Sequence, residues 1–332
     1  MNTAYGPNPT MDLLLDQFDR LHSPPVVALR VLELTRDPNF DVAELLDCLE
    51  RDPALSASLL RLINSSYYGV PREIPSLQQA VTYLGRRTLR LAVLGFGLVH
   101  SMLRGAPAAF LRSYWRRSLT MASAARKLAY ILDDPDEVDA DVAFTAALLA
   151  DLGMAALVQI DPQEYLSLTR QEHVWAHRQA ERDALGFDHV DFGVHLLTRW
   201  YIPLPILGAV RDHHGCSLEA PLLSQTIAAS NLLSEALWTP NSPCIAPLRH
   251  IFEQGLGLQL DTLITLANAC KSDVCEAAAS FDVAIDGEID ISAMERQARE
   301  TFDATAIQIA TDLDIVEAFM AEHYRSDQRV FD

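Results

Sequence analysis

Apolar residues recur at helical spacing along the whole of this 332-residue chain, and this pattern limits the possible folds more than any other feature. After Pro53, for example, Leu55, Leu59 and Leu62 fall on one face of a helix. No run of β-branched residues alternates with polar ones as a half-buried strand does. Apolar residues make up 49% of the chain, which is enough for a substantial core. The pattern therefore predicts an all-α protein.

Helix start and stop signals divide the chain further. Asp41, Asp188 and the Asp52-Pro53 pair are typical helix starts, as is Pro24-Pro25, and Gly85 is a helix end. Further helices are expected near 110–132, 139–159, 163–184, 188–200, 203–213 and 221–238, with joints at 105–110 and 239–247, and breaks near 255–257 and 282–287. We expect a tail over 1–11, a helical lobe over 12–105, a second helical lobe over 106–240 and an acidic helical extension over 241–332.

The net charge of −19 comes from 26 basic and 45 acidic side chains and limits the class of partner. Acidic residues are most in excess over 216–332, with 19 acidic and 6 basic side chains. A field of this sign repels phosphate backbones, so general binding of DNA or RNA is disfavoured. The acidic C-terminal segment is typical of solvated helix faces.

Cysteine usage and hydropathy indicate a cytoplasmic protein. The five cysteines are odd in number and lack zinc-finger spacing, which is typical of reduced thiols. The first residues show neither the basic nor the apolar region of a signal peptide. The most apolar stretch, Val142 to Ile160, is interrupted by Asp151. We interpret it as a buried core helix, not a membrane span.

Several motifs along residues 12–238 resemble the HDOD family. They are SPPVVALRVLEL (23–34), LLDCLERDPALSASLLRLINSSYYG (45–69), IPSLQQAVTYLGRRTLRLAV (74–93), YWRRSLTMASAARKLA (114–129), AFTAALLADLGMAALVQ (143–159), LGFDHVDFGVHLLTRWYIPLPILGAVRDHH (185–214) and IAASNLLSEAL (227–237). The resemblance implies a two-lobed helical bundle like that of HD-type phosphohydrolases. The segment after residue 240 has no recognised counterpart.

The resemblance also implies where metal ligands would lie. HD-type enzymes hold a divalent metal with a first His, a His-Asp pair and a late Asp, and the metal activates a water that attacks phosphorus. Here those positions are Arg117, Ala150 with Asp151, and Asn231, and Met154 replaces a Lys that active members carry. Guanidinium cannot ligate a metal. Three of the four ligands are lost, so hydrolysis by this route is expected to be absent or very slow.

Other candidate ligands remain. His189, His213 and His214 match positions where binuclear relatives carry histidines for a second metal. With Asp151 they would suit a single transition metal such as Fe, Ni or Zn, although the family resemblance favours an empty pocket and no cofactor is expected. The alternative is a structural role: His213 and His214 would cap a helix C-terminus, and His189 would pack against a neighbour such as Trp200.

Two further features stay open. Asp151 in an apolar segment must be paired or neutralised, and Arg117 is the favoured partner, ahead of a metal or exposure to solvent. Arg86, Arg87 and Arg90 cluster after Gly85 and would either be solvated or bind an anion or an acidic partner. The tripeptide at Glu235 spells EAL, the name of a phosphodiesterase family, and we interpret it as chance.

Three functions follow as hypotheses. The favoured one is a non-catalytic bacterial signal-transduction module that binds a signalling protein and no membrane. The first alternative is a metal-dependent phosphohydrolase that uses Asp151, His189, His213 and His214. The second alternative is a sensor that binds a cyclic dinucleotide through the arginines without cleaving it.

Overall fold

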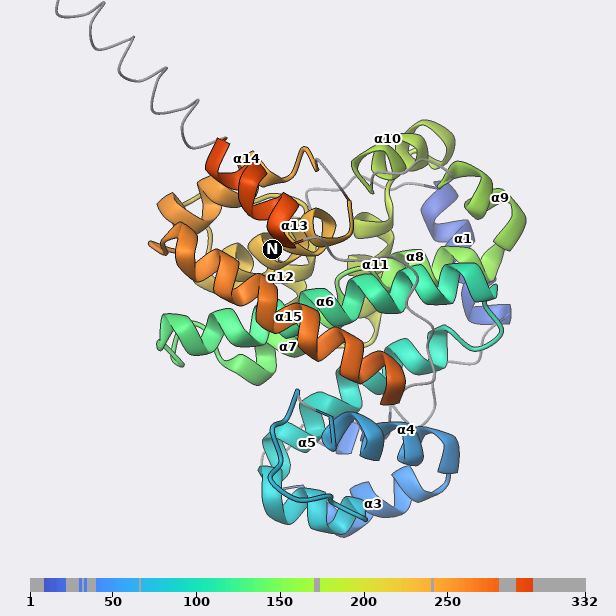
Figure 1. Ribbon diagram of the computed structural model, residues 1–332. Helices are drawn as coiled ribbons and strands as arrows, with labels where there is room; N and C mark the ends of the chain where they lie inside the picture. The colour runs from blue at the N-terminus through green and yellow to red at the C-terminus, as the bar shows by residue number, and fades with distance from the viewer. Residues whose placement is uncertain are drawn as a thin grey trace, which may run out of the picture.

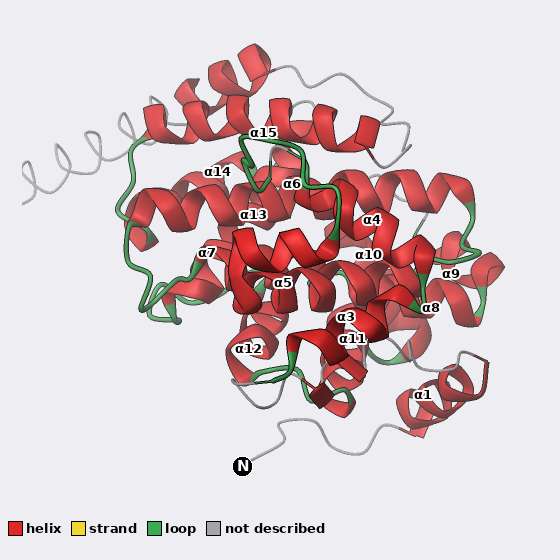
Figure 2. Cartoon of the chain, turned by 90° about the horizontal axis from the view of Figure 1, so that it is seen from below, coloured by secondary structure: helices red, strands yellow, loops and turns green. Residues whose placement is uncertain are grey.

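The computed structural model of the chain consists of helices joined by turns (Figure 1, Figure 2). It describes residues 9–21, 30–31, 33–34, 40–65, 67–169, 174–239, 242–280 and 291–300. No strand occurs in these ranges, so the all-α prediction is confirmed. The predicted helix start at Pro24-Pro25, the break near 282–287 and most of the predicted tail lie outside the described residues.

Most of the described residues belong to helices. They are α1 (Pro9–Leu21), α3 (Val42–Glu50), α4 (Pro53–Ile63), α5 (Leu77–Met102), α6 (Ala108–Leu132), α7 (Ala140–Leu149), α8 (Leu152–Ile160), α9 (Pro162–Leu168), α10 (Val174–Leu185), α11 (His189–Arg199), α12 (Leu204–Asp212), α13 (Leu222–Trp238), α14 (Ile245–His250), the π-helix η1 (Ile251–Gly255) and α15 (Leu260–Ser280), and residues 291–300 are also helical.

The aspartates predicted to start helices cap the helix N-termini in the structure. The carboxylate of Asp41 accepts a hydrogen bond from the backbone N–H of Ala43 at 2.8 Å, and Asp52 accepts one from Leu55 at 3.0 Å. Asp188 caps α11 in a capping box with Asp191. At Gly85 a φ of 81° kinks α5, a conformation that glycine adopts without strain.

Several predicted helix boundaries were wrong, among them the joint at 105–110, inside which α6 begins at Ala108. Helix α1 begins at Pro9, inside the predicted tail, and Met11 in its first turn is buried. The segment predicted as one helix over 163–184 contains two, α9 and α10, and α14 begins inside the predicted joint at 239–247. The helix predicted over 139–159 breaks at Ala150 and Asp151, where the φ of Asp151 is −95° and its ψ is 15°.

The core crosses the boundary predicted between the two lobes. Helices α3, α4 and α5 lie together at one end of the molecule (Figure 1). Yet one hydrophobic cluster runs from Met11 in α1 through α5, α6 and α7 to Ile227 in α13. The two predicted lobes therefore share one continuous core.

A second hydrophobic cluster attaches the C-terminal extension. It joins Leu128 of α6 and Leu233 of α13 to Phe252 of η1 and Leu263 of α15. Helix α15 packs along α6 (Figure 1). The carboxylate of Asp273 on α15 accepts a hydrogen bond from Ser123 at 2.6 Å and lies 3.0 Å from the Lys127 amine.

The stretch Ala140–Ile160 is long and apolar enough to cross a membrane by composition alone. In the fold, however, residues 143–158 of this stretch are buried inside the protein, in α7, α8 and the junction between them. The interpretation of this stretch as a core element is consistent with that burial. Asp151 is the one ionisable side chain between Val142 and Ile160, and it lies at the break between the two helices.

Candidate functional site

Asp151 lies at the centre of the candidate site, where its carboxylate is 1% exposed. One oxygen, Oδ2, accepts a hydrogen bond from Nε of Arg117 at 2.5 Å. The other, Oδ1, lies 3.2 Å from Nε2 of His213 and 3.7 Å from Nε2 of His189. Asp151 therefore joins two half-sites, one built around a guanidinium and one around imidazoles.

Arg117 on α6 fills the first half-site. Besides Asp151, its guanidinium donates to Oε2 of Glu235 at 3.0 Å and to Oδ1 of Asn231, both on α13. The side chain is 13% exposed. The predicted pairing of Arg117 with Asp151 is therefore present, and this half-site holds a fixed cation between Asp151 on one side and Asn231 and Glu235 on the other.

Glu235 was missed by the sequence interpretation, which dismissed its tripeptide as chance. It lies four residues after Asn231, so both side chains point from the same face of α13 toward Arg117. That spacing was the available signal.

The charges of this half-site stabilise one another. Burial alone would raise the pKa of Asp151, but the guanidinium of Arg117 holds it well below the usual range. Burial would likewise lower the pKa of Arg117, and the carboxylates of Asp151 and Glu235 raise it instead. Both groups are therefore charged in the folded protein.

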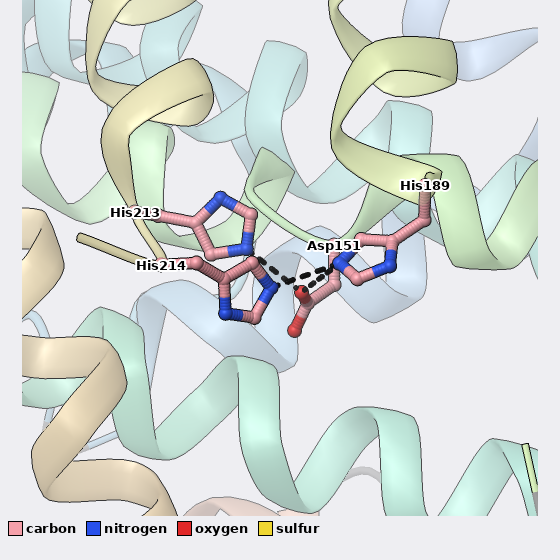
Figure 3. Close-up of side chains that lie close together, drawn as sticks. All are labelled: Asp151, His189, His213 and His214. Atoms are coloured by element: carbon pink, nitrogen blue, oxygen red, sulfur yellow. Dashed lines mark hydrogen bonds and ion pairs between the residues drawn. The ribbon is translucent and has the colours of Figure 1, made fainter. Parts of the chain in front are cut away.

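The second half-site gathers Asp151, His189, His213 and His214 (Figure 3). One ligand atom from each residue lies within 4.8 Å of the others, and all four side chains are buried. The Nε2 atoms of His189 and His214 are 2.9 Å apart. The structure thus brings together all four residues that the sequence nominated as metal ligands.

His213 faces Asp151 with an unprotonated nitrogen when its ring is neutral. Its Nδ1 lies 2.6 Å from the carbonyl oxygen of Val210, which can only accept, so Nδ1 carries the proton. Burial lowers the pKa of His213, which favours the neutral ring. The lone pair of Nε2 then points at the Asp151 carboxylate, and a shared cation would relieve this repulsion.

Glu181 on α10 fixes the other side of the cluster. Its Oε2 accepts from the backbone N–H of His189 at 2.9 Å and from Nδ1 of the same residue at 2.7 Å, while Oε1 accepts from the hydroxyl of Tyr165 at 2.6 Å. Burial would lower the pKa of His189, but Glu181 raises it. The proton therefore sits on Nδ1, and Nε2 faces the cluster. In metal sites, a carboxylate commonly holds the ring of a ligating histidine in this way.

Contacts between helices that are far apart in the sequence hold the remaining groups. Burial and the neighbouring His213 hold the pKa of His214 well below its usual value. Nδ1 of His214 accepts a hydrogen bond from the Asn231 amide at 3.2 Å. A Cβ at Gly153 would lie 1.9 Å from the carbonyl oxygen of His189. The sequence interpretation named neither Glu181 nor Gly153, since neither carries a motif.

The remaining nominated positions lie elsewhere. Ala150 is buried in the hydrophobic core, and Met154 borders a cavity beside Arg117. Arg86 donates to the carbonyl oxygen of Phe40, and Arg87 pairs with Asp139. Arg90 is half-buried, and burial together with Arg87 lowers its pKa.

Comparison with known proteins identifies the family. The HDOD domain model matches residues 21–216. The chain belongs to the HDOD family. This match spans the helices that carry Arg117, Asp151 and the three histidines of the cluster.

Solved structures share the HDOD fold. An HDOD domain protein from Geobacter sulfurreducens is 22% identical with a TM-score of 0.60, covering 84% of this chain and 99% of that one. A protein from Shewanella amazonensis named as a candidate phosphohydrolase is 22% identical with a TM-score of 0.61, covering 81% and 97%. At these identities the likeness concerns the fold alone.

A sequence relative is also known. An uncharacterised protein from Treponema pallidum is 26% identical over 235 residues, which is 64% of this chain. The aligned part is only 42% of that protein, so this chain spans less than half of its relative's length.

Proposed function

We propose that this HDOD protein is a regulatory module that does not hydrolyse phosphoesters and that acts by binding a signalling protein. The observation that carries the proposal is the position of Arg117, whose guanidinium is held by Asp151, Asn231 and Glu235. A guanidinium offers donors only and cannot activate a water as a metal does. The positive charge of the half-site is thus supplied by the protein itself.

Hydrolysis assays test the first part of the proposal. The purified chain is incubated with nucleotides and a generic phosphodiester, with Mn²⁺, Fe²⁺, Ni²⁺ or Zn²⁺ added. We expect no turnover above that of buffer and metal alone. Metal-dependent turnover that disappears in both Asp151→Ala and His213→Ala would overturn the proposal.

The partner is inferred from charge and from the family. With a net charge of −19, the chain favours a protein partner over nucleic acid. A structural relative from Marinobacter aquaeolei is named as a candidate signal transduction protein. The partner is tested by affinity capture and by reconstitution of the captured protein with the pure chain. A saturable complex of the two pure proteins is expected, and failure to form one with any captured protein would contradict this part.

A metal-binding function is the second candidate, and the histidine cluster favours it. The imidazole and carboxylate donors suit Fe, Ni or Zn, and the residues fit such an ion because Asp151 keeps Oδ1 toward the cluster while Oδ2 binds Arg117. Glu181 orients His189, and the carbonyl of Val210 orients His213. A bound metal would supply Lewis acidity for phosphoester hydrolysis.

Elemental analysis separates the two candidates. Protein purified without a metal-affinity tag is measured by ICP-MS beside the Asp151→Ala variant. A near-stoichiometric transition metal that is lost in the variant would establish the site and strengthen the hydrolase alternative. The absence of metal in both samples would remove this candidate and leave the binding module.

A further inference from the structure

The turn between α11 and α12 holds a tyrosine where glycine is the usual residue. Helix α11 ends in a Schellman motif, in which the backbone N–H of Ile202 donates to the carbonyl oxygen of Leu197 at 3.1 Å. The backbone N–H of Tyr201 donates to the carbonyl oxygen of Thr198 at 3.0 Å. Tyr201 has a φ of 57°, a left-handed conformation that is strained for a bulky residue. Backbone strain of this kind clusters at functional positions, and none of the functions considered so far uses Tyr201.

The same turn exposes an apolar surface. The side chains of Tyr201 and Leu204 are 75% and 79% exposed, the two highest values among the large apolar side chains of the described residues. Pro203 and Pro205 are exposed as well, while Ile202 is buried and fixes the turn to the core. Tyr201, Pro203, Leu204 and Pro205 are called the apolar knob below. Contiguous exposed apolar side chains mark sites of protein interaction.

A cation accompanies the knob. Arg211 is exposed on α12, seven residues after Leu204, so both side chains lie on one face of that helix. The guanidinium of arginine stays charged and binds carboxylates well. A surface that complements the knob is therefore apolar and has a carboxylate at its edge.

A groove with these properties lies on the same chain, between α1, α8, α9 and α10. Its volume of about 50 Å³ is several times the roughly 10–15 Å³ that one water needs, so the branched end of a leucine side chain fits. Most of its wall is apolar and is formed by Leu14, Leu157, Ile160, Tyr165, Leu168 and Leu185. Because Leu204 is 79% exposed, the knob does not fill the groove of its own chain.

The rim of the groove is acidic. Asp161 and Glu164 border it, and both are exposed. The Asp161 carboxylate caps α9, because it accepts from the backbone N–H groups of Gln163 and Glu164 at 3.1 and 2.9 Å. Glu164 is therefore the rim carboxylate that best suits an incoming arginine.

We propose that the apolar knob of one copy of this chain binds the groove of a second copy. Leu204 enters the groove, Tyr201 packs over its edge, and Arg211 pairs with Glu164 of the second copy. Each copy gives one knob and receives one, so a twofold axis closes the assembly as a dimer. The inference is independent of the proposed function, because a dimer requires neither an inactive half-site nor a signalling partner.

The net charge of −19 on each copy opposes this association at long range. At about 0.15 M salt, however, charges more than about 8 Å apart are largely screened. The contacts within the interface then decide, and they pair an apolar knob with an apolar groove and a cation with a carboxylate.

Sedimentation equilibrium of the full chain at micromolar concentrations, in about 0.15 M NaCl, tests the proposal. We expect a monomer–dimer equilibrium. Leu204→Ser and Tyr201→Gly should each raise the dissociation constant of the dimer at least about tenfold, as loss of a central anchor does. The control Tyr83→Ser removes an exposed aromatic ring from α5 and should leave the constant unchanged. A chain that stays monomeric, or a dimer that both knob variants leave intact, would overturn the proposal.

The Tyr201→Gly variant also separates association from folding. Glycine adopts a positive φ without strain, so the variant should melt at an equal or higher temperature than the parent chain at dilutions where both are monomeric. A lower melting temperature would show that the ring of Tyr201 supports the fold of its own chain, and the argument from strain would fail.

A charge exchange identifies the two surfaces in contact. Arg211→Glu should weaken the dimer at least about tenfold, because it brings two carboxylates together. Addition of Glu164→Arg to the same chain should restore the dimer, since the pair is then present with its signs reversed. A double variant that associates no better than Arg211→Glu alone would show that the knob does not meet this groove.

Discussion

Arg117 and Asp151 form a buried ion pair, and removal of either side chain alone is expected to lower the free energy of unfolding. Asp151 is 1% exposed and Arg117 is 13% exposed, so solvent compensates little for a lost partner. Glu235 and Asn231 hold the same guanidinium from α13. The pair thus links α6, the α7–α8 junction and α13. It contributes to the stability of the fold, and Arg117 supplies the positive charge of the half-site.

Replacing Asp151 tests this link. We expect Asp151→Ala to lower the free energy of unfolding by about 3–5 kcal/mol, because it leaves the Arg117 charge partly unpaired. Urea denaturation in the presence of a chelator measures the loss without any metal contribution. The exposed Asp134→Ala serves as control. An equal effect of the two substitutions would show that the pair adds no stability.

Glu181 acts on the histidine cluster through His189. If ICP-MS shows a metal, Glu181→Gln should weaken its binding by about 10–100-fold, because the neutral amide no longer favours the protonated Nδ1 of His189. Metal titration followed by calorimetry measures this change. The exposed Glu164→Gln provides the control, and an unchanged affinity in Glu181→Gln would remove the positioning role.

At the scale of elements, the approach of α8 to α11 decides where His189 lies. Gly153 near the start of α8 faces the carbonyl oxygen of His189 at the start of α11, and its backbone N is 3.1 Å from the Cβ position of Gly193. Neither backbone can yield without moving a whole helix. The absence of a side chain at Gly153 is therefore a condition for the cluster.

A matched pair of glycine substitutions checks this contact. Gly153→Ala should destabilise the protein by about 1–3 kcal/mol through overpacking. Gly208→Ala on α12 meets nothing within 4 Å and has no strained φ, so it should stabilise by about 0.4–1 kcal/mol. Thermal unfolding of both variants gives the comparison. Two changes of the same sign would contradict the packing argument.

At the scale of the whole molecule, the described part of the C-terminal extension, residues 242–280 and 291–300, packs onto the rest of the fold. Its helices share the second hydrophobic cluster with α6 and α13, the same helices that supply Arg117, Asn231 and Glu235. The HDOD model ends at residue 216, before α13 begins. The family match alone therefore does not delimit a stable unit in this chain.

Truncation after residue 239 tests that conclusion. It would expose Leu128, Leu233 and Leu237, each worth about 1.5–3 kcal/mol when fully buried. We expect the shortened chain to unfold at a markedly lower temperature or to aggregate, as calorimetry and size-exclusion chromatography would show. A truncated chain with the melting temperature of the full one would prove the extension dispensable.

The helical class and most helix starts were accessible from the amino-acid sequence, because periodicity and caps are local properties. The residues nominated for the site came from the resemblance to the HDOD family. Asp41, Asp52 and Asp188 act as predicted, and the four nominated metal ligands do converge. The break at Asp151, the roles of Glu181 and Glu235, and the close approach at Gly153 depended on tertiary structure. Those features arise from contacts between helices far apart in the chain, and a carboxylate or a glycine carries no local sign of the partner that it will meet.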